Sequence, residues 1–480
     1  MDKGTVDLTA TVAGRHCFSD AAPPTGDWAD TPNALADYYR CPPNLLRFLP
    51  AHQSSGPICY FQLGQDTICY GRLSNADAAA VGKREDLLQR AQAGANGIRL
   101  PFDPTEVVEN LRRERYSAHY REEGRLLNTL LRKAYYLLRP HLSVPVRRHL
   151  QKIHLRGWDK IRFPAWPVDC TVERIHQKLL ALAMRAEGLQ EIPFIWFWPE
   201  GFRGCAILTH DVEDPGGQDF CPQLMDLDES FGFRSSFQVV PEKRYRVPRS
   251  FLDNIVSRGF EVNVHDLNHD GRLYADHEEF LRRAKRINHY VREFGAQGFR
   301  SGVMYRNADW YDAFEFSYDM SIPNVAHLDP QRGGCCTVMP HFIGKIVELP
   351  LTCTQDYTLF NILGDFSLEL WKRQIALVNA EHGLISFVVH PDYVIDPKAQ
   401  ATYKMLLGYL AELRATEQIW TPLPRDVAQW WRQRSRMELV CERGAWRVEG
   451  PGKERARVAY ASLAGDTVNY SLAGAGCLVH

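Results

Sequence analysis

Between residues 194 and 425 the chain alternates short apolar segments with longer amphipathic ones, and this alternation constrains its fold more than any other feature. The apolar segments have the length of buried strands and lie at 205–209, 236–240, 260–264, 298–301, 320–323, 346–351 and 384–390. Helical patterns fall between them, for example at 277–294, 367–381 and 399–414. Strands that alternate with helices predict a parallel sheet. We therefore expect an irregular α/β barrel of about seven parallel strands.

The segments on either side of the predicted barrel differ from it in pattern. The first part of the chain is mixed and rich in turns, with short strands expected at 57–61 and 67–70. A helix-rich part follows, and Thr105 is expected to cap its first helix. After Trp431, short apolar segments predict a small β appendage. The sequence is thus divided into a mixed region, a basic helical region, the barrel and the appendage, at 1–100, 101–193, 194–430 and 431–480.

The stretch 111–162 is strongly basic, with 14 Lys or Arg against 4 Asp or Glu. One interpretation is a patch that docks on a membrane surface or on an anionic substrate linked to a lipid or a nucleotide. The alternative is a set of helices whose arginines solvate one face or pair with acidic residues elsewhere in the fold. Both alternatives stay open from the sequence.

Composition sets wider bounds on the class of protein. The chain has 480 residues, 45% of them hydrophobic, and a net charge of −1, so it can bury a large core and gives no global indication of nucleic-acid binding. No apolar run is long enough for a transmembrane span, and the N-terminus lacks the features of a secretory signal. The 12 cysteines form no CxxC pair and are interpreted as reduced thiols. We therefore expect a cytoplasmic protein.

Polar residues follow several of the predicted strands at their carboxyl ends. Asp211 follows the first strand, His265 the third, Arg300 lies on the fourth, and His390 ends the last. In α/β barrels the chemistry collects at this end of the strands. The sequence therefore predicts one site that contains all four residues.

Two histidines and an upstream acidic cluster give this predicted site the character of a metal centre. His265 and His269 are four residues apart, so both can face one metal ion from a helical turn or from a loop after a strand. Alternate strand residues share a face, so Asp211 and Glu213 are expected to point the same way, as one base and one metal ligand. The alternative is that Asp211, Glu213 or Asp214 caps the next helix.

These residues resemble the ordered motifs of the polysaccharide deacetylases (the NodB-homology domain, carbohydrate esterase family 4). The motifs are Thr209-His210-Asp211, His265-Asp266-Leu267-Asn268-His269, Phe299-Arg300-Ser301 and Phe387-Val388-Val389-His390, within residues 195–425. In that family one Asp and two His hold a metal, usually zinc. The resemblance implies that Asp211 is the base, that His265 and His269 are metal ligands, that Arg300 orients the base and that His390 is the acid.

The sequence also departs from the family pattern at three positions. Val212 stands where the family has its metal-binding Asp, so Glu213 or Asp214 is expected to supply that ligand. Asp266 replaces the Ser or Thr after the first histidine, and Gly302 replaces a Pro. The best candidate for the fourth motif is Glu348-Leu349-Pro350 followed by Gln355-Asp356-Tyr357.

Three further residues are candidates for binding a sugar. Tyr305 and Trp310 follow Arg300, and an aromatic face packs well on a sugar ring, although both could equally serve loop packing. Asp356 is a third candidate for substrate binding. By contrast, Asp226-Leu227-Asp228 lies in a predicted helix and is expected to solvate its surface.

The resulting hypothesis is a metal-dependent hydrolase that removes an N-acetyl group from a sugar or a polysaccharide precursor, using an Asp base and a His acid. The expected cofactor is a divalent metal, zinc first, with cobalt, nickel or iron as alternatives. The expected partner is a carbohydrate, with peripheral membrane contact through 111–162 and no nucleic acid. Two alternatives remain: a metal-independent hydrolase of a small amide on the same barrel, and a non-catalytic protein that binds glycans or acts as a scaffold in polysaccharide assembly.

Overall fold

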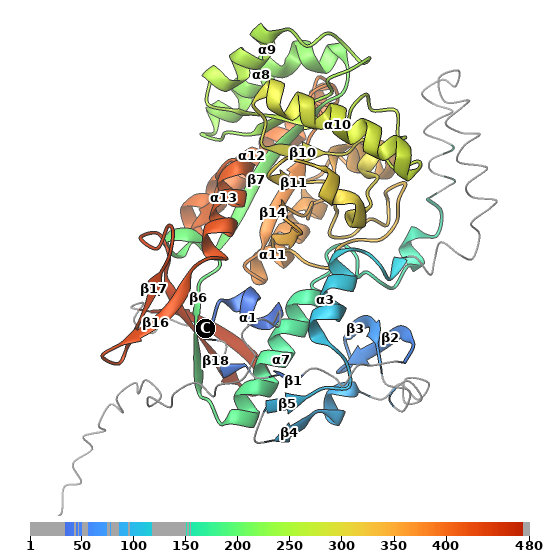
Figure 1. The fold of residues 1–480 in the computed structure, drawn as a ribbon. Coiled ribbons are helices and arrows are strands. Elements are labelled where there is room, and N and C mark those ends of the chain that lie inside the picture. Colours follow the sequence, from blue (N-terminus) through green and yellow to red (C-terminus); the bar gives the residue numbers. More distant parts are fainter. Residues whose placement is uncertain are drawn as a thin grey trace, which may run out of the picture.

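The computed structural model describes residues 155–473 continuously and most of residues 34–117 (Figure 1). Within the N-terminal part the undescribed residues are 43–44, 47, 50–55, 74–76, 78–85 and 95–96, and of 118–154 only residues 150 and 153 are described. In Figure 1 a large sheet with helices around it lies above a smaller unit, which combines blue and teal N-terminal segments with red C-terminal strands.

Nine strands form the large sheet within the described part of the chain, in the order β12-β13-β11-β10-β9-β8-β7-β14, with β15 also paired to β7. Their bounds are β7 (Gly204–Val212), β8 (Ser236–Val239), β9 (Glu261–His265), β10 (Gly298–Arg300), β11 (Tyr318–Asp319), β12 (His341–Ile343), β13 (Ile346–Glu348), β14 (Leu384–Val388) and β15 (Ile419–Trp420). In this sheet β12 runs antiparallel to β13, and the other pairings are parallel.

The predicted α/β architecture with a mostly parallel sheet is confirmed, but the sheet is a curled half-barrel. Among the described strands no pairing joins β12 to β14 or β15. The strands β12 and β15 were not predicted, because segments of three and two residues give no readable pattern. The strand expected at 320–323 is instead β11 at Tyr318–Asp319, and beyond it the pairing continues as an isolated parallel bridge between Pro323 and Leu351.

The helices between the strands pack their apolar faces against the sheet in one core, except the last helix, whose buried residues belong to a second core shared with the N-terminal part. Their bounds are α8 (Pro215–Ser230), α9 (Arg249–Ser257), α10 (His277–Phe294), α11 (Glu369–Ala380), α12 (Pro397–Thr416) and α13 (Pro424–Arg434). Three of them begin at an aspartate whose carboxylate accepts backbone N–H bonds of the first turn: Asp214, Asp276 and Asp396. Such caps fix where each helix starts after its strand.

The N-terminal part of the chain forms helices and short strands beneath the sheet. Their bounds are α1 (Ala34–Tyr39), β1 (Phe48–Leu49), β2 (Ile58–Leu63), β3 (Thr67–Arg72), β4 (Gln92–Gly94), β5 (Gly97–Arg99), α3 (Pro104–Arg112), α7 (Thr171–Glu187) and β6 (Glu191–Ile195). The predicted hairpin is present as β2 and β3, which pair antiparallel. The predicted cap Thr105 is wrong: α3 starts at Pro104, so Asp103 is its N-cap and accepts from Thr105 N at 2.8 Å.

The C-terminal strands complete a sheet that starts before the barrel. The strands β16 (Glu438–Glu442) and β17 (Ala445–Glu449) form a hairpin. The strands β18 (Val458–Ala464) and β19 (Thr467–Leu472) pair with each other, and β18 also pairs antiparallel with β6. The segment predicted as an appendage therefore shares a sheet with residues that precede β7.

A buried ion pair ties the N-terminal part to the loop after β10. The guanidinium of Arg306 donates to Glu114 from Nε at 2.7 Å and from Nη2 at 2.5 Å, and both side chains are buried. Tyr116 OH donates to Gly334 O at 2.6 Å beside this pair. Most of the basic stretch 111–162 lies outside the described residues; within the described part, Arg115 pairs with Asp309 at 2.9 Å.

Nine described cysteines carry free thiols, and eight of these are buried. Cys441 on β16 is instead disulfide-bonded, so the expectation of reduced thiols does not hold there. Among the described helices, none combines the length and the apolar character needed to cross a membrane.

Candidate active site

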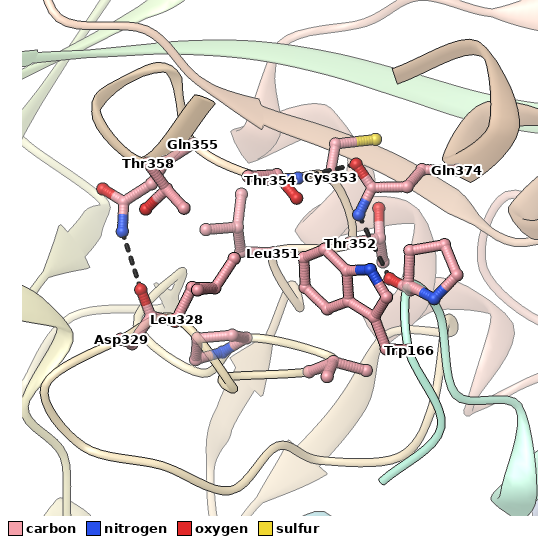
Figure 2. Close-up of a pocket in the computed structure, with 13 residues that line it drawn as sticks. Trp166, Leu328, Asp329, Leu351, Thr352, Cys353, Thr354, Gln355, Thr358 and Gln374 are labelled. Atoms are coloured by element: carbon pink, nitrogen blue, oxygen red, sulfur yellow. Dashed lines mark hydrogen bonds between the residues drawn. The ribbon is translucent and has the colours of Figure 1, made fainter. Parts of the chain in front are cut away.

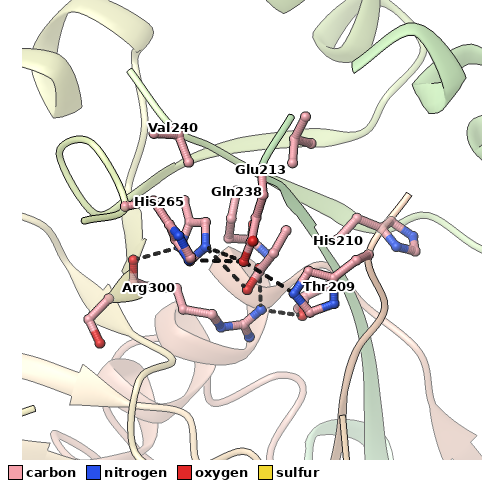
Figure 3. Close-up of polar contacts among 12 residues, drawn as sticks. Thr209, His210, Glu213, Gln238, Val240, His265 and Arg300 are labelled. Carbon is pink, nitrogen blue, oxygen red and sulfur yellow. Dashed lines mark hydrogen bonds and ion pairs between the residues drawn. The ribbon is translucent and has the colours of Figure 1, made fainter. Parts of the chain in front are cut away.

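The structure brings Glu213, His265 and His269 together at the carboxyl ends of the strands. Figure 3 shows Glu213 beside His265. Glu213 follows the last residue of β7, and His265 is the last residue of β9. Glu213 Oε1 lies 2.9 Å from His269 Nε2 and 3.5 Å from His265 Nε2. One potential ligand atom from each residue falls within 4.8 Å of the other two, which is the arrangement of a metal site.

Local backbone geometry aims the two histidines at this point. Asp266 and His269 have φ values of +54° and +53°, so the segment between the histidines is a tight loop and not a helical turn. His265 Nδ1 faces Arg300 O at 3.0 Å and must donate to it, because a carbonyl only accepts. That bond leaves His265 Nε2 directed toward Glu213.

The residues present fit a divalent cation. Both ring nitrogens of His269 are buried and have no hydrogen-bond partner among the described residues, although Nε2 is close to the Glu213 carboxylate. Burial raises the pKa of Glu213, but the nearby His269, His265 and His390 outweigh burial and hold that pKa well below its usual value. Two imidazoles and one ionised carboxylate form a ligand set typical of zinc.

The structure distinguishes between Glu213 and Asp214, the two carboxylates predicted as alternative metal ligands. The Asp214 side chain caps α8, where its Oδ1 accepts from Gly217 N at 2.7 Å. Val212 is fully buried in the core on the other side of β7. Glu213 is therefore the carboxylate that reaches the two histidines.

Asp211 and Arg300 form a second, buried pair beside this group. Arg300 Nη1 donates to Asp211 Oδ1 at 2.7 Å and to Thr209 Oγ1 at 2.8 Å, while Arg300 Nε donates to Met320 O at 3.0 Å. Asp211 Oδ2 lies 3.6 Å from His265 Nε2. Burial raises the pKa of Asp211, but the Arg300 guanidinium and the histidines outweigh it and hold the pKa below its usual value. Asp211 is thus an ionised carboxylate at neutral pH.

His390 reaches the same point from the neighbouring strand, just after β14. Its Nε2 lies 3.4 Å from Glu213 Oε1, and its Nδ1 lies 2.6 Å from Asp356 Oδ1. The backbone N–H of His390 also donates to Asp356 Oδ2 at 2.7 Å. Burial lowers the pKa of His390, but the Asp356 carboxylate outweighs it and raises the pKa well above its usual value. Asp356, a candidate for substrate binding, thus holds the ring and the backbone N–H of His390.

The two aromatic residues predicted to bind a sugar occupy other places. Trp310 packs against α10, with ring centroids 5.2 Å from Phe280 and 5.0 Å from His277. Tyr305 is buried to 7% exposure, and its carbonyl accepts from the Ser301 hydroxyl at 2.5 Å. Both residues therefore take part in packing the loop after β10.

Two of the departures from the family pattern lie next to each other in space. A Cβ at Gly302 would approach Asp266 Oδ2 to 2.6 Å and His269 Cδ2 to 2.9 Å. The Asp266 carboxylate is fully buried, and neither of its oxygens has a hydrogen-bond partner among the described residues. The structure therefore predicts a dependence between the acid at 266 and the glycine at 302, because a side chain at 302 would crowd this carboxylate.

Asp392 is a residue near the site that the sequence did not single out. Burial raises its pKa to about 7, and it is close enough to His390 and Glu213 to sense their charges. Its Oδ1 has no partner in the described structure. The only sign in the sequence that Asp392 belongs to the site is its position two residues after His390.

A small cavity lies beside Gln355, the residue that precedes Asp356 (Figure 2). Its walls include Trp166, Asp329 and Gln355, and Gln355 Nε2 donates to Asp329 Oδ1 at 2.9 Å. Its volume of about 20 Å³ holds a water molecule but no sugar ring. The cavity is therefore not a substrate pocket in this conformation.

No protein-family model and no curated protein matches the chain. Several solved structures are similar to it over about half its length. A protein described as a polysaccharide deacetylase from Mycobacterium smegmatis is 19% identical, with a TM-score of 0.40, covering 50% of this chain and 93% of its own. The peptidoglycan deacetylase of Bacillus subtilis is 11% identical, with a TM-score of 0.32, covering 49% and 95%.

A crystal structure of an allantoinase is also similar, with 13% identity and a TM-score of 0.39, covering 49% of this chain and 92% of that one. The polysaccharide deacetylases that the motifs resemble thus recur among the structures similar to this chain. These identities and TM-scores assign no activity to it.

Proposed function

We propose that this protein hydrolyses the N-acetyl group of a sugar or a polysaccharide precursor with the help of a divalent metal ion. One observation carries the proposal. The Glu213, His265 and His269 group adjoins the Asp211–Arg300 pair through His265 and the His390–Asp356 pair through Glu213, so the ion site has a base and an acid beside it. Amide hydrolysis needs a base that takes a proton from the attacking water and an acid that protonates the departing amine.

The ion would be held by Glu213, His265 and His269. Bound there, a divalent cation supplies polarisation of the acetyl carbonyl and brings the pKa of a water molecule from about 16 to near 7. Zinc fits the two imidazoles and the carboxylate, and cobalt, nickel or iron would accept the same donors.

Asp211 is the proposed base. Its carboxylate is ionised and held by Arg300, so one oxygen is fixed in place while Oδ2 is directed toward His265. This oxygen takes a proton from the attacking water. Arg300 cannot take the proton itself, because a guanidinium stays protonated in proteins.

His390 is the proposed acid. Its raised pKa keeps the ring protonated at neutral pH, and Asp356 fixes Nδ1. The proton on Nε2 then goes to the nitrogen of the departing amine. General acid catalysis of this kind contributes roughly 10²–10⁴ in rate.

A second candidate function is the hydrolysis of a small amide without a metal. It is favoured by the contacts of Glu213, whose Oε1 already pairs with His265, His269 and His390 in this structure. In that case Glu213 would orient the three rings. The two candidates differ in whether activity depends on an added ion.

We also propose a carbohydrate linked to a lipid or a nucleotide as the substrate, and the cytoplasm as the compartment. The basic composition of 111–162 supports an anionic group on the substrate. The nine free thiols support a reducing compartment, whereas the disulfide-bonded Cys441 counts against it.

The test is acetate release from N-acetylglucosamine, its oligomers and its UDP-linked form, measured for wild type beside His269→Ala and Asp214→Asn. We expect release by wild type with added zinc or cobalt, near-complete loss in His269→Ala, and retention in Asp214→Asn, because Asp214 only caps α8. Acetate release that survives a chelator and His269→Ala would favour the metal-free hydrolase. Binding of these sugars without release at any ion would point to a glycan-binding protein and overturn the proposal.

A further inference from the structure

His210 is a fully buried residue for which the proposed reaction has no direct use. It lies on β7 between Thr209 and Asp211, and its side chain leaves the strand on the opposite face from Asp211 because strand side chains alternate. Figure 3 shows its ring directed away from His265 and Arg300. The ring instead packs against Phe237, with centroids 5.0 Å apart.

Both ring nitrogens of His210 face oxygen atoms. Nδ1 lies 3.0 Å from Val389 O, and Nε2 lies 3.1 Å from Asp228 Oδ2. Val389 is the residue that follows the last residue of β14, and its N–H donates to Thr209 O at 3.0 Å. The His210 ring therefore adds one more contact between β7 and the chain from β14, just beyond the point where the strand ends.

Asp228 anchors the other side of the ring. It lies in α8 with no exposed surface, so the prediction that this stretch of the helix solvates its surface is wrong at this residue. Its Oδ2 accepts from Ser235 Oγ and its Oδ1 from Tyr403 OH, each at 2.6 Å. A carboxylate with three fixed partners can hold the imidazole in one orientation.

The peptide group between Val389 and His390 is fixed at both of its polar atoms. Its carbonyl oxygen faces His210, and its N–H donates to Asp356 Oδ2 at 2.7 Å. Asp356 also binds the His390 ring. Rotation of this peptide would break one or both contacts and would move His390.

We propose that His210, through its contact with Val389 O, is a positioning residue that fixes His390 relative to Asp211. This inference rests on the proposed function, because it gives His390 the acid role and Asp211 the base role. The same strand thus carries the base on one face and the support of the acid on the other. A displacement of about 1 Å at a reacting group can cost on the order of 100-fold in rate.

Two amide variants separate the two contacts of His210. In His210→Asn the amide nitrogen is as far from the backbone as Nδ1, so the donor to Val389 O is kept and the link to Asp228 is lost. In His210→Gln the amide nitrogen reaches as far as Nε2, so the link to Asp228 is kept and the donor to Val389 O is lost. If His210 only stabilised the fold through its contact with Asp228, His210→Asn would be the more damaging change.

The assay compares an N-acetylglucosamine trimer with 4-nitrophenyl acetate, whose leaving group needs no proton. For His210→Gln we expect kcat on the trimer to fall at least about tenfold with little change in KM, while turnover of the ester falls less than about threefold. His210→Asn should keep most of its trimer kcat. Equal losses in both variants and on both substrates would overturn the proposal.

The nitrogen-15 resonances of the His390 ring provide a readout that does not depend on turnover. We expect them to shift in His210→Gln and to stay near the wild-type positions in His210→Asn. If wild type releases no acetate, the proposed function fails, and these resonances alone decide the placement of His390. Unchanged resonances in both variants would overturn the positioning role.

Discussion

At the scale of single residues, Glu213 is the carboxylate that reaches the two histidines, although Val212 stands at the family's metal-binding position. Alternation along β7 sends Val212 into the core and Glu213 toward the histidines. Glu213 lies just after the end of β7, and its side chain, one methylene longer than that of an aspartate, still reaches His269. The sequence could place the two histidines and both carboxylates at one edge, but it could not choose between Glu213 and Asp214, because that choice depends on where α8 begins.

Asp356 gives a prediction at this same scale. Asp356→Asn should lower kcat by roughly 10–100-fold while bound metal stays near the wild-type level, because His390 loses its charged partner and the metal ligands are untouched. The measurement is kcat together with metal content by mass spectrometry. A loss of bound metal equal to the loss of activity would show that Asp356 acts through the metal site.

At the scale of elements, the sequence predicted most of the sheet and the long helices but not the contacts between loops. The helix expected at 277–294 is found as α10 (His277–Phe294), since its periodic apolar face and its Asp276 cap agree. Loop contacts depend on residues far apart in sequence, such as Asp266 and Gly302. For that reason the sequence left open whether Trp310 binds a sugar or packs the loop, and the structure shows it packed on α10.

The dependence between Asp266 and Gly302 can be tested with a double-mutant cycle. Gly302→Ala should lower the free energy of unfolding by about 1–3 kcal/mol, because the new methyl group meets Asp266 Oδ2 and the His269 ring. Adding Asp266→Ser should recover part of that loss. Urea denaturation of the wild type, both single variants and the double variant measures the coupling, and strictly additive effects would contradict it.

At the scale of the whole molecule, the flanking regions are built into the barrel domain through buried polar contacts. Glu114 holds Arg306, and Glu173 of α7 accepts from Thr337 Oγ1 and, at 3.3 Å, from Val338 N. The C-terminal β18 pairs with β6. These contacts join segments that are distant in sequence, so pattern and propensity could delimit the regions but not show how they assemble.

Glu173 predicts how stability depends on pH. Burial raises its pKa to about 8 in the folded state, whereas a glutamate in the unfolded chain has a pKa of about 4.3. Between these two pH values the folded state holds a proton that the unfolded chain has lost. The stability from this group is present at low pH and is lost as the pH rises toward about 8. Glu173→Gln should therefore be more stable than wild type at pH 9, by a few kcal/mol at most.

Urea denaturation at pH 6 and pH 9 measures this difference. The matched control is Glu187→Gln at the exposed end of α7, which should leave the pH dependence unchanged. If wild type and Glu173→Gln lose stability in parallel between the two pH values, Glu173 is not a source of the dependence.

Metal content tests the central claim, that Glu213, His265 and His269 hold a divalent cation. The measurement is metal per chain after dialysis against zinc, for wild type beside Glu213→Ala and Asp214→Ala. We predict about one ion per chain in wild type and in Asp214→Ala, and almost none in Glu213→Ala. Zinc retained by Glu213→Ala, or absent from all three proteins, would contradict the proposed site.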